Sequence, residues 1–295
     1  MELIKHIFIE FYFRKEKRFL LEHSYQGNKS ILLENYGVYD GCLKVADILI
    51  DKIKEKQKYI SINNQWIDEI KLYYVSDPLQ QGGYDTNSVI ENNKFKPLII
   101  FINPHNDDIY TSLVHELQHA YEDYNRRINN KPSLTDYSDK LAYAKYATYI
   151  QDENNTKRTI SRILYFLTSF EKNAYISEIS AEMKRCDKSF PNIESVVEYI
   201  KTTTAYRAFE KIERLTNMIV NIQDKDKQEK IVTFINEMTN SEFNTYKQFV
   251  KFLSNKLLKC SQKINTLLPK IAYETLKTGK QLYHFQSKEF LKSNS

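Results

Sequence analysis

The first third of the chain shows the hydrophobic patterns of short strands and one helix. Alternating or continuous apolar residues indicate strands at residues 4–13, 70–75 and 97–102. The apolar residues of segment 42–54 recur at helical spacing, and the turn-rich stretch 82–89 leads into a further strand or a hairpin. We therefore expect a small mixed β-sheet in this part of the chain.

Beyond residue 107 the apolar positions follow a helical period instead. Asp108 is placed to cap the first of these helices, and a loop rich in Asn and Pro follows at residues 128–138. The last third is amphipathic helix that we expect to break near Pro269. Helices are expected at 108–127, 141–150, 156–185 and in several segments after Pro191. The expected class is α+β, a small mixed sheet followed by a mainly α-helical C-terminal part.

The composition is that of an ordinary soluble globular protein. The chain is 41% hydrophobic and 27% charged, and its net charge of +5 comes from 43 basic and 38 acidic residues that are interspersed. It has no block of Lys and Arg and no aromatic-basic motif, so we expect no nucleic-acid partner. Apolar runs such as 98–102 are far too short to cross a bilayer, so we expect no membrane partner.

The cysteines and the first residues favour a cytoplasmic location. Cys42, Cys186 and Cys260 are far apart and form no CxxC pair, so neither a disulfide framework nor a thiolate zinc site is indicated. Lys5 and Glu10 interrupt any apolar stretch of the kind that a signal peptide contains. We expect a protein of a reducing, cytoplasm-like compartment.

Two histidines one helical turn apart give the most specific chemical signal. Residues 115–119 read His-Glu-Leu-Gln-His, which is an HExxH motif. Residues four apart on a helix share one face, so His115 and His119 can both bind one metal ion. Glu116 is rotated by about 100° from His115, so it flanks the metal and can accept a proton from a metal-bound water. The alternative is a pair of structural histidines on a helix face.

The segment around this motif resembles the active-site helix of zinc-dependent metallopeptidases of the small gluzincin-like type, which occur in bacterial and phage genomes. The order of strand 97–102 and then helix is similar, and the resemblance covers about residues 70–185. The metzincin pattern is excluded, because Glu122 and Asn125 stand where its Gly and His would be. The resemblance implies Zn²⁺ as cofactor, His115 and His119 as ligands, Glu116 as general base, and a third ligand from a following helix.

Glu171 is the third ligand that we predict. Residues 171–174, Glu-Lys-Asn-Ala, resemble the ExxA pattern of the ligand helix, although Asn173 stands where the thermolysin-like form has a glutamate. If 156–185 is one helix, Glu171 continues an apolar stripe and should point inward, where a metal would compensate its charge. That stripe is formed by Ile160, Leu164 and Leu167.

Other roles for the nearby carboxylates stay open. Glu178 also has an alanine three residues on, and it is the alternative ligand; it lies about 10 Å further along the helix, so both glutamates are not expected to bind one ion. Alternatively Glu171, Glu178 and Glu182 line a solvated acidic face. Either Glu122 or Asp123 can orient an imidazole, or Asp123 can pair with a nearby arginine.

These features predict a zinc metallopeptidase that hydrolyses a peptide or protein substrate through a zinc-bound water activated by Glu116. We expect residues 1–190 to form a zincin-like domain, with strand 97–102 placed where a substrate-pairing edge strand is useful. Residues 191–295 form a helical extension that packs on it or contacts a protein partner, and they should be dispensable for metal binding. The alternative is a phage-related structural or assembly protein that keeps the fold, which would then be virion-associated.

Overall fold

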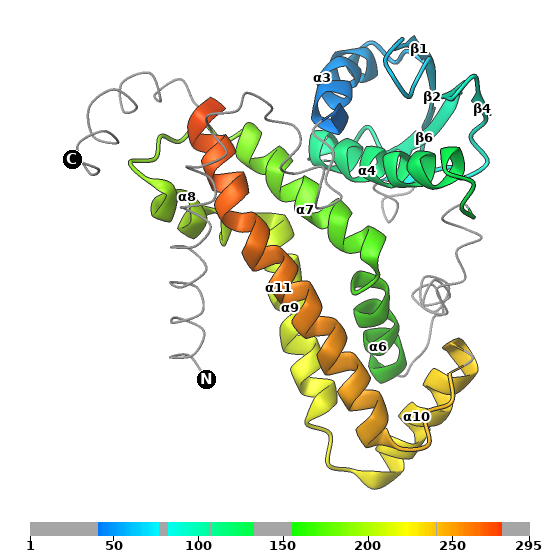
Figure 1. Ribbon diagram of the computed structural model, residues 1–295, viewed down its shortest axis with the longest axis vertical. Coiled ribbons are helices and arrows are strands. Elements are labelled where there is room, and N and C mark those ends of the chain that lie inside the picture. Colours follow the sequence, from blue (N-terminus) through cyan, green and yellow to red (C-terminus); the bar gives the residue numbers. More distant parts are fainter. Residues whose placement is uncertain (1–40, 77–81, 107, 133–154, 240, 279–295) are drawn as a thin grey trace.

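The computed structural model describes residues 41–76, 82–106, 108–132, 155–239 and 241–278 (Figure 1). The strand expected at 4–13 and the helix expected at 141–150 lie outside these residues. The described residues form a small mixed sheet with two helices beside it, followed by a group of helices, so the α+β class is confirmed. None of the helices described is long and apolar enough to span a membrane.

The sheet has four strands in the order β1-β2-β6-β3. The strands β2 and β6 pair in parallel, whereas the other two pairs are antiparallel. A separate two-stranded ribbon, β4 with β5, lies between β3 and β6 in the chain. The strands are β1 Tyr59–Ser61, β2 Glu69–Tyr74, β3 Gly82–Tyr84, β4 Ile90–Glu91, β5 Lys94–Phe95 and β6 Leu98–Ile102.

The strand expected at the edge of the sheet lies in its interior. β6 is paired on both sides, with β2 and with β3, so the expectation that residues 97–102 form an edge strand is wrong. An unbroken run of apolar residues is typical of a strand with both faces covered, and it does not distinguish an interior strand from an edge strand. Among the described strands, β3 is the edge next to β6.

Two helices, α3 (Gly41–Lys54) and α4 (Ile109–Ile128), pack with the sheet (Figure 1). Alternate residues of β2 and β6, such as Leu72 and Ile100, are fully buried in the same core as the apolar side chains of both helices. Asp108 caps α4 as expected, because its carboxylate accepts a hydrogen bond from the backbone N–H of Thr111 at 3.1 Å. This cap fixes where the helix that carries the HExxH motif begins.

The remaining described helices form the second part of the fold. They are α6 Asn155–Phe166, α7 Ser169–Lys184, α8 Ile193–Ile200, α9 Thr204–Val220, α10 Lys225–Thr239 and α11 Tyr246–Thr278. The single helix expected at 156–185 is wrong, since Thr168 is extended and separates α6 from α7. The Thr168 hydroxyl donates to the carbonyl of Tyr165 at 2.8 Å, and such local side-chain bonds compete with helix continuation.

The break expected at Pro269 is also wrong, because α11 passes through this residue. A proline inside a helix costs about 3 kcal/mol or more. Leu268, which precedes it, and Ile271, two residues after it, are buried in the helical core, and each such side chain contributes about 1.5–3 kcal/mol. Burial on both sides therefore outweighs the lost hydrogen bond.

The buried side chains form two clusters. The first joins the sheet, α3 and α4, and the second joins α6 to α11. Most buried apolar residues of α7 belong to the second cluster, but Ala181 belongs to the first. The division into domains at residue 190 stays a prediction. The helix that carries Glu171 packs against α4 and also against α9 and α11, which follow residue 190.

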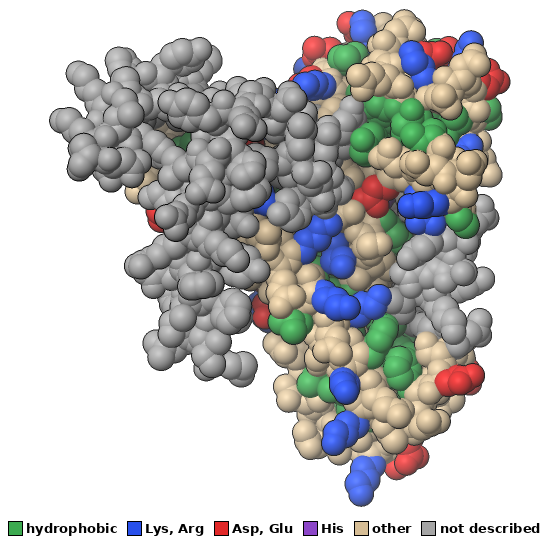
Figure 2. Space-filling view, in the orientation of Figure 1, with side chains coloured by type: hydrophobic (Ala, Val, Ile, Leu, Met, Phe, Trp, Pro, Cys, Tyr) green, Lys and Arg blue, Asp and Glu red, His purple; other side chains and the backbone are tan. Residues whose placement is uncertain are grey.

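Lysines are concentrated on α11. This helix contains seven lysines and one acidic residue, Glu274. Figure 2 shows Lys and Arg side chains along one face of the helical part of the molecule, with few acidic side chains among them. Most of the α11 lysines are exposed or half-buried, and one of them, Lys263, reaches the neighbourhood of the HExxH motif.

Candidate metal centre

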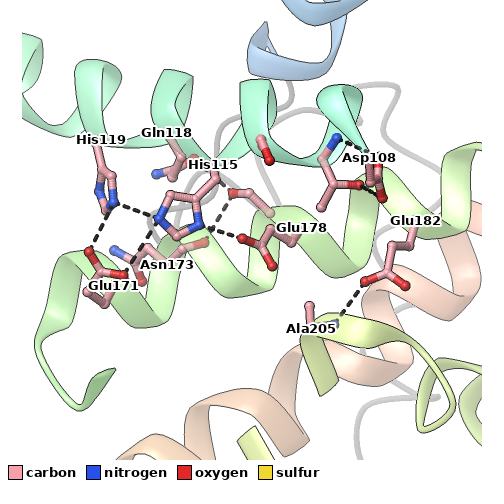
Figure 3. Close-up of polar contacts among 12 residues, drawn as sticks. Asp108, His115, Gln118, His119, Glu171, Asn173, Glu178, Glu182 and Ala205 are labelled. Carbon is pink, nitrogen blue, oxygen red and sulfur yellow. Dashed lines mark hydrogen bonds and ion pairs between the residues drawn. The ribbon is translucent and has the colours of Figure 1, made fainter. Parts of the chain in front are cut away.

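Helix α4 brings the two histidines of the motif together. The Nε2 atoms of His115 and His119 lie 2.9 Å apart, and both rings point towards α7 (Figure 3). Their side chains are 14% and 11% exposed, so the site is largely sheltered and still reachable from solvent. The spacing of four residues produces this arrangement directly, because it returns the second side chain to the face of the first.

Helix α7 supplies a carboxylate to the same point. Oε1 of Glu171 lies 3.2 Å from Nε2 of His119, and Oε2 lies 3.6 Å from Nε2 of His115. Glu171 stands in the first turn of α7 and is 2% exposed. One donor atom from each of the three residues lies within 4.8 Å of the other two. His115, His119 and Glu171 therefore form a group that can hold a metal ion.

The chemistry of this group fits a divalent cation. Nδ1 of His119 is buried and finds no hydrogen-bond partner within the described part of the chain, and the buried Oε1 of Glu171 has Nε2 of His119 at 3.2 Å as its neighbour. A buried carboxylate is costly unless its charge is compensated, and a cation between the three residues would compensate it. Two imidazoles with one carboxylate are a common donor set for zinc, and ligands of a tetrahedral zinc ion lie about 3.4 Å apart.

Glu178 contacts the outer side of His115. Its Oε1 atom lies 2.6 Å from Nδ1 of His115, on the side of the ring away from Glu171 (Figure 3). A carboxylate in this position fixes the ring and keeps the proton on Nδ1, so that Nε2 is available to a metal. The structure thus brings Glu171, and not the alternative ligand Glu178, to the two Nε2 atoms.

The pKa values reflect this alternation of histidines and carboxylates. Burial lowers the pKa of His115, but the hydrogen bond to Glu178 and the charges of Glu178 and Glu171 outweigh it and raise the pKa to about 10. Burial raises the pKa of Glu171, but the charge and hydrogen bond of His119 outweigh it and lower the pKa to about 2. Without a metal, the charges of His115 and of the carboxylates beside it stabilise one another.

Glu116 stays outside the group of metal donors. It is half-buried and lies between α4 and the edge strand β3, where a Cβ atom at Gly82 would be 3.3 Å from its Cγ and 3.5 Å from its Oε1. The glycine thus leaves the room that the Glu116 side chain occupies. The negative charge of Glu116 contributes to the raised pKa of His115, so the carboxylate is near the site without belonging to it.

The other carboxylates have partners of their own. Glu182 accepts hydrogen bonds from the backbone N–H groups of Thr204 and Ala205 at the start of α9, at 2.8 and 2.9 Å. With Glu171 and Glu178 turned to the histidines, the alternative of a solvated acidic face is wrong. Asp123 accepts a hydrogen bond from the Tyr84 hydroxyl at 2.6 Å and lies 3.5 Å from Arg127.

Aromatic rings that the sequence did not single out surround the donors. Phe170 packs edge-on against His119, and Tyr175 packs edge-on against His115. The hydroxyl of Tyr165, on α6, is hydrogen-bonded to Glu171; burial and then the charge of Glu171 raise the pKa of this tyrosine. With 22 tyrosines in the chain, no signal in the sequence distinguishes these from the rest. The packing of α6 against α7 brings these aromatic side chains to the donors.

Comparisons of the chain with models of protein families, with curated proteins and with solved structures each find no match. The resemblance to gluzincin-like metallopeptidases therefore stays a prediction from the HExxH motif, beside which the structure shows a group of possible metal donors.

Proposed function

We propose that the chain is a zinc-dependent metalloendopeptidase of the gluzincin-like type. The observation that carries the proposal is the separation of roles between four side chains. His115, His119 and Glu171 converge on one point, whereas Glu116 stands beside them without joining the group. A metal needed only for structure has no use for a carboxylate in that place.

The donor group would hold zinc with three protein ligands, and sites of this kind keep a fourth position for water or substrate. When bound, zinc polarises a carbonyl group and lowers the pKa of a nearby water molecule to about 7. Glu116 would accept a proton from the attacking water and deliver it to the leaving amine. General acid–base catalysis of this kind contributes about 10²–10⁴-fold to a rate.

The sheet supports a peptide as the substrate. Among the described strands, β3 pairs on one side only, with β6, so its other edge leaves backbone N–H and C=O groups for an extended chain. Gly82 of this strand lies against Glu116. A peptide that extends the sheet at β3 would therefore pass close to the proposed base.

The experiment that tests the proposal compares the wild-type protein with Glu116→Gln. Zinc content is measured by elemental analysis, and hydrolysis is measured on a degenerate peptide library by mass spectrometry. We expect both proteins to bind one zinc ion, and the variant to cleave about 10²–10⁴-fold more slowly. Undiminished cleavage by the variant contradicts the role of Glu116. A zinc-loaded wild-type protein that cleaves no library member favours a structural or assembly protein instead.

A further inference from the structure

A chain of polar side chains links α11 to the two helices of the metal centre. Lys263 of α11 donates a hydrogen bond to Oδ1 of Asn173 on α7. The amide of Asn173 donates in turn to Oε1 of Glu122 on α4, at 2.5 Å. Glu122 also accepts a hydrogen bond from Gln118 at 3.0 Å, and Oε1 of Gln118 accepts one from Ser177 at 3.1 Å. The contacts therefore run from α11 to α7, on to α4, and back to α7.

The members of this chain alternate in sequence with the residues of the metal centre. Gln118 directly precedes His119, Asn173 follows Glu171 by two residues, and Ser177 directly precedes Glu178. The polar contacts and the metal donors thus occupy the same turns of α4 and α7. Any force that holds the polar contacts in register also holds the donors in register.

This register decides whether three donors can reach one ion. A slide of one residue along a helix moves a side chain by about 1.5 Å. Metal–ligand distances tolerate only about 0.2 Å. A small shift of α7 along α4 would therefore remove Glu171 from coordination while both helices stay folded.

The turn of α7 that carries Glu171 has no side-chain cap to stabilise it. Thr168 is the N-cap of α7, but its side chain makes no capping hydrogen bond to the helix. The first N–H groups of an uncapped helix have no partner within it, so such an end frays easily. Asn173 lies two residues beyond Glu171, about half a turn, and Lys263 contacts it from α11.

We propose that Lys263 is a positioning residue for the metal centre, acting through Asn173 to hold Glu171 in register with His115 and His119. The proposal rests on the metal site proposed above. Lys263 is half-buried, and burial lowers its pKa while the charge of Glu122 opposes that effect. A lysine that donates to Asn173 on α7 and is near the charge of Glu122 on α4 is placed to act on both helices, whereas Lys259 and the other exposed lysines of α11 face solvent.

The test compares Lys263→Met, which removes the ammonium group, with Lys263→Arg, which keeps a charged donor. The matched control is Lys259→Met, because Lys259 stands one turn away on α11, is exposed and carries the same charge. For each protein, zinc affinity is measured by competition with a chromophoric chelator. The visible spectrum of the cobalt(II)-loaded protein reports the set of ligands.

We expect Lys263→Met to bind zinc about 10–100-fold more weakly, as is usual when a group that supports a ligand is removed. Its cobalt spectrum should change in the way that the spectrum of Glu171→Ala does. Lys263→Arg and Lys259→Met should keep the wild-type affinity and spectrum. Wild-type zinc affinity and spectrum in Lys263→Met would overturn the proposal, and so would an equal loss in Lys259→Met.

A second variant distinguishes a weaker metal site in Lys263→Met from a general loss of folding. Removing one partner leaves Glu122 as an uncompensated charge, whereas Lys263→Met with Glu122→Gln removes both charges together. In the folded double variant, zinc binding weaker than that of Glu122→Gln alone supports a positioning role for Lys263, and binding equal to that of Glu122→Gln overturns it. If the wild-type protein binds no zinc or cobalt, the metal site itself fails. If it binds zinc and hydrolyses nothing, only the peptidase activity fails.

Discussion

Nδ1 of His115 lies 2.6 Å from a carboxylate oxygen of Glu178, while the opposite nitrogen of the same ring faces His119 and Glu171. The two glutamates of α7 that the sequence offered as rival ligands thus contact opposite sides of one imidazole. Their separation of seven residues, two helical turns, is what lets them do so. The two glutamates therefore have different roles. Glu171 faces the Nε2 atoms of the histidines, and Glu178 orients the ring of His115.

Substitution of these glutamates should separate the two roles. We expect Glu178→Ala to weaken zinc binding about 10–100-fold, because His115 loses the group that orients it. Glu171→Ala should lose more affinity, since a ligand itself is removed. Glu182→Ala, on the same helix, serves as control and should bind zinc as the wild type does. Chelator competition measures all three, and a greater loss in Glu178→Ala than in Glu171→Ala would exchange the assignments.

Gly82 should matter for hydrolysis and not for the metal. The Cβ of Gly82→Ala would lie 3.3 Å from Cγ of Glu116, so the carboxylate has to shift by a few tenths of an ångström. We expect a roughly tenfold lower rate of peptide cleavage, because displacement of a catalytic group costs rate. Zinc affinity should be unchanged. Gly83→Ala is the control, since successive residues of a strand face opposite sides. Equal losses in both variants would point to disruption of β3 as a whole.

The stability of the metal-free protein should depend on pH on both sides of a maximum. The pKa of His115 is raised from 6.5 to about 10, so its stabilising effect is complete below pH 6.5 and is lost as the pH rises through about 10. The pKa of Glu171 is lowered from 4.5 to about 2, so its effect is present above pH 4.5 and is lost as the pH falls through about 2. From these two groups we expect the greatest stability between pH 4.5 and 6.5.

Urea unfolding in the presence of a chelator measures this profile. His115→Gln is the control, and its free energy of unfolding should lack the decline between about pH 6.5 and 10 that is expected of the wild type. Because zinc must displace the proton from His115, zinc affinity should rise with pH over the same range. A zinc affinity that is flat from pH 6.5 upward would contradict a raised pKa for His115.

Truncation after residue 190 should abolish tight metal binding. The sequence suggested the opposite, since every candidate ligand precedes that residue. Buried side chains of α7, such as Ile176 and Ile179, nevertheless pack in the cluster that α8 to α11 complete, and Lys263 lies on α11. We expect residues 1–190 alone to bind zinc weakly or to be insoluble. Chelator competition on the soluble fraction measures the zinc affinity of the truncated protein. Wild-type affinity there would support the expectation from the sequence that residues 191–295 are dispensable for metal binding.

The sequence predicted those parts of the site that depend on local geometry. The spacing of His115 and His119 needs only one helix, and the cap at Asp108 defines where that helix begins. Glu171 was placed inward by an apolar stripe along a single helix, and it is buried although Thr168 interrupts that helix. The prediction that Glu171 points inward is confirmed because α6 and α7 pack in the same core, so both keep their apolar faces inward.

What the sequence did not predict depends on contacts between distant segments. Tyr165 and Lys263 belong to helices on either side of α7, and no local pattern distinguishes them from other tyrosines and lysines. The position of β6 inside the sheet depends on β3, a strand of three residues with two glycines and little apolar pattern. The unbroken course of α11 through Pro269 depends on burial that only the assembled helices provide.

The distribution of the donors between the two buried clusters bears on how the molecule unfolds. His115 and His119 stand on α4, which packs with the sheet, and Glu171 stands on α7, which contacts α4 but has most of its buried apolar side chains in the helical cluster. An ion bound by all three would join the two parts, so neither could open without releasing it. Metal loading should therefore merge two separate local openings into one cooperative transition, with backbone amides of both parts exchanging their hydrogens at a common, slower rate.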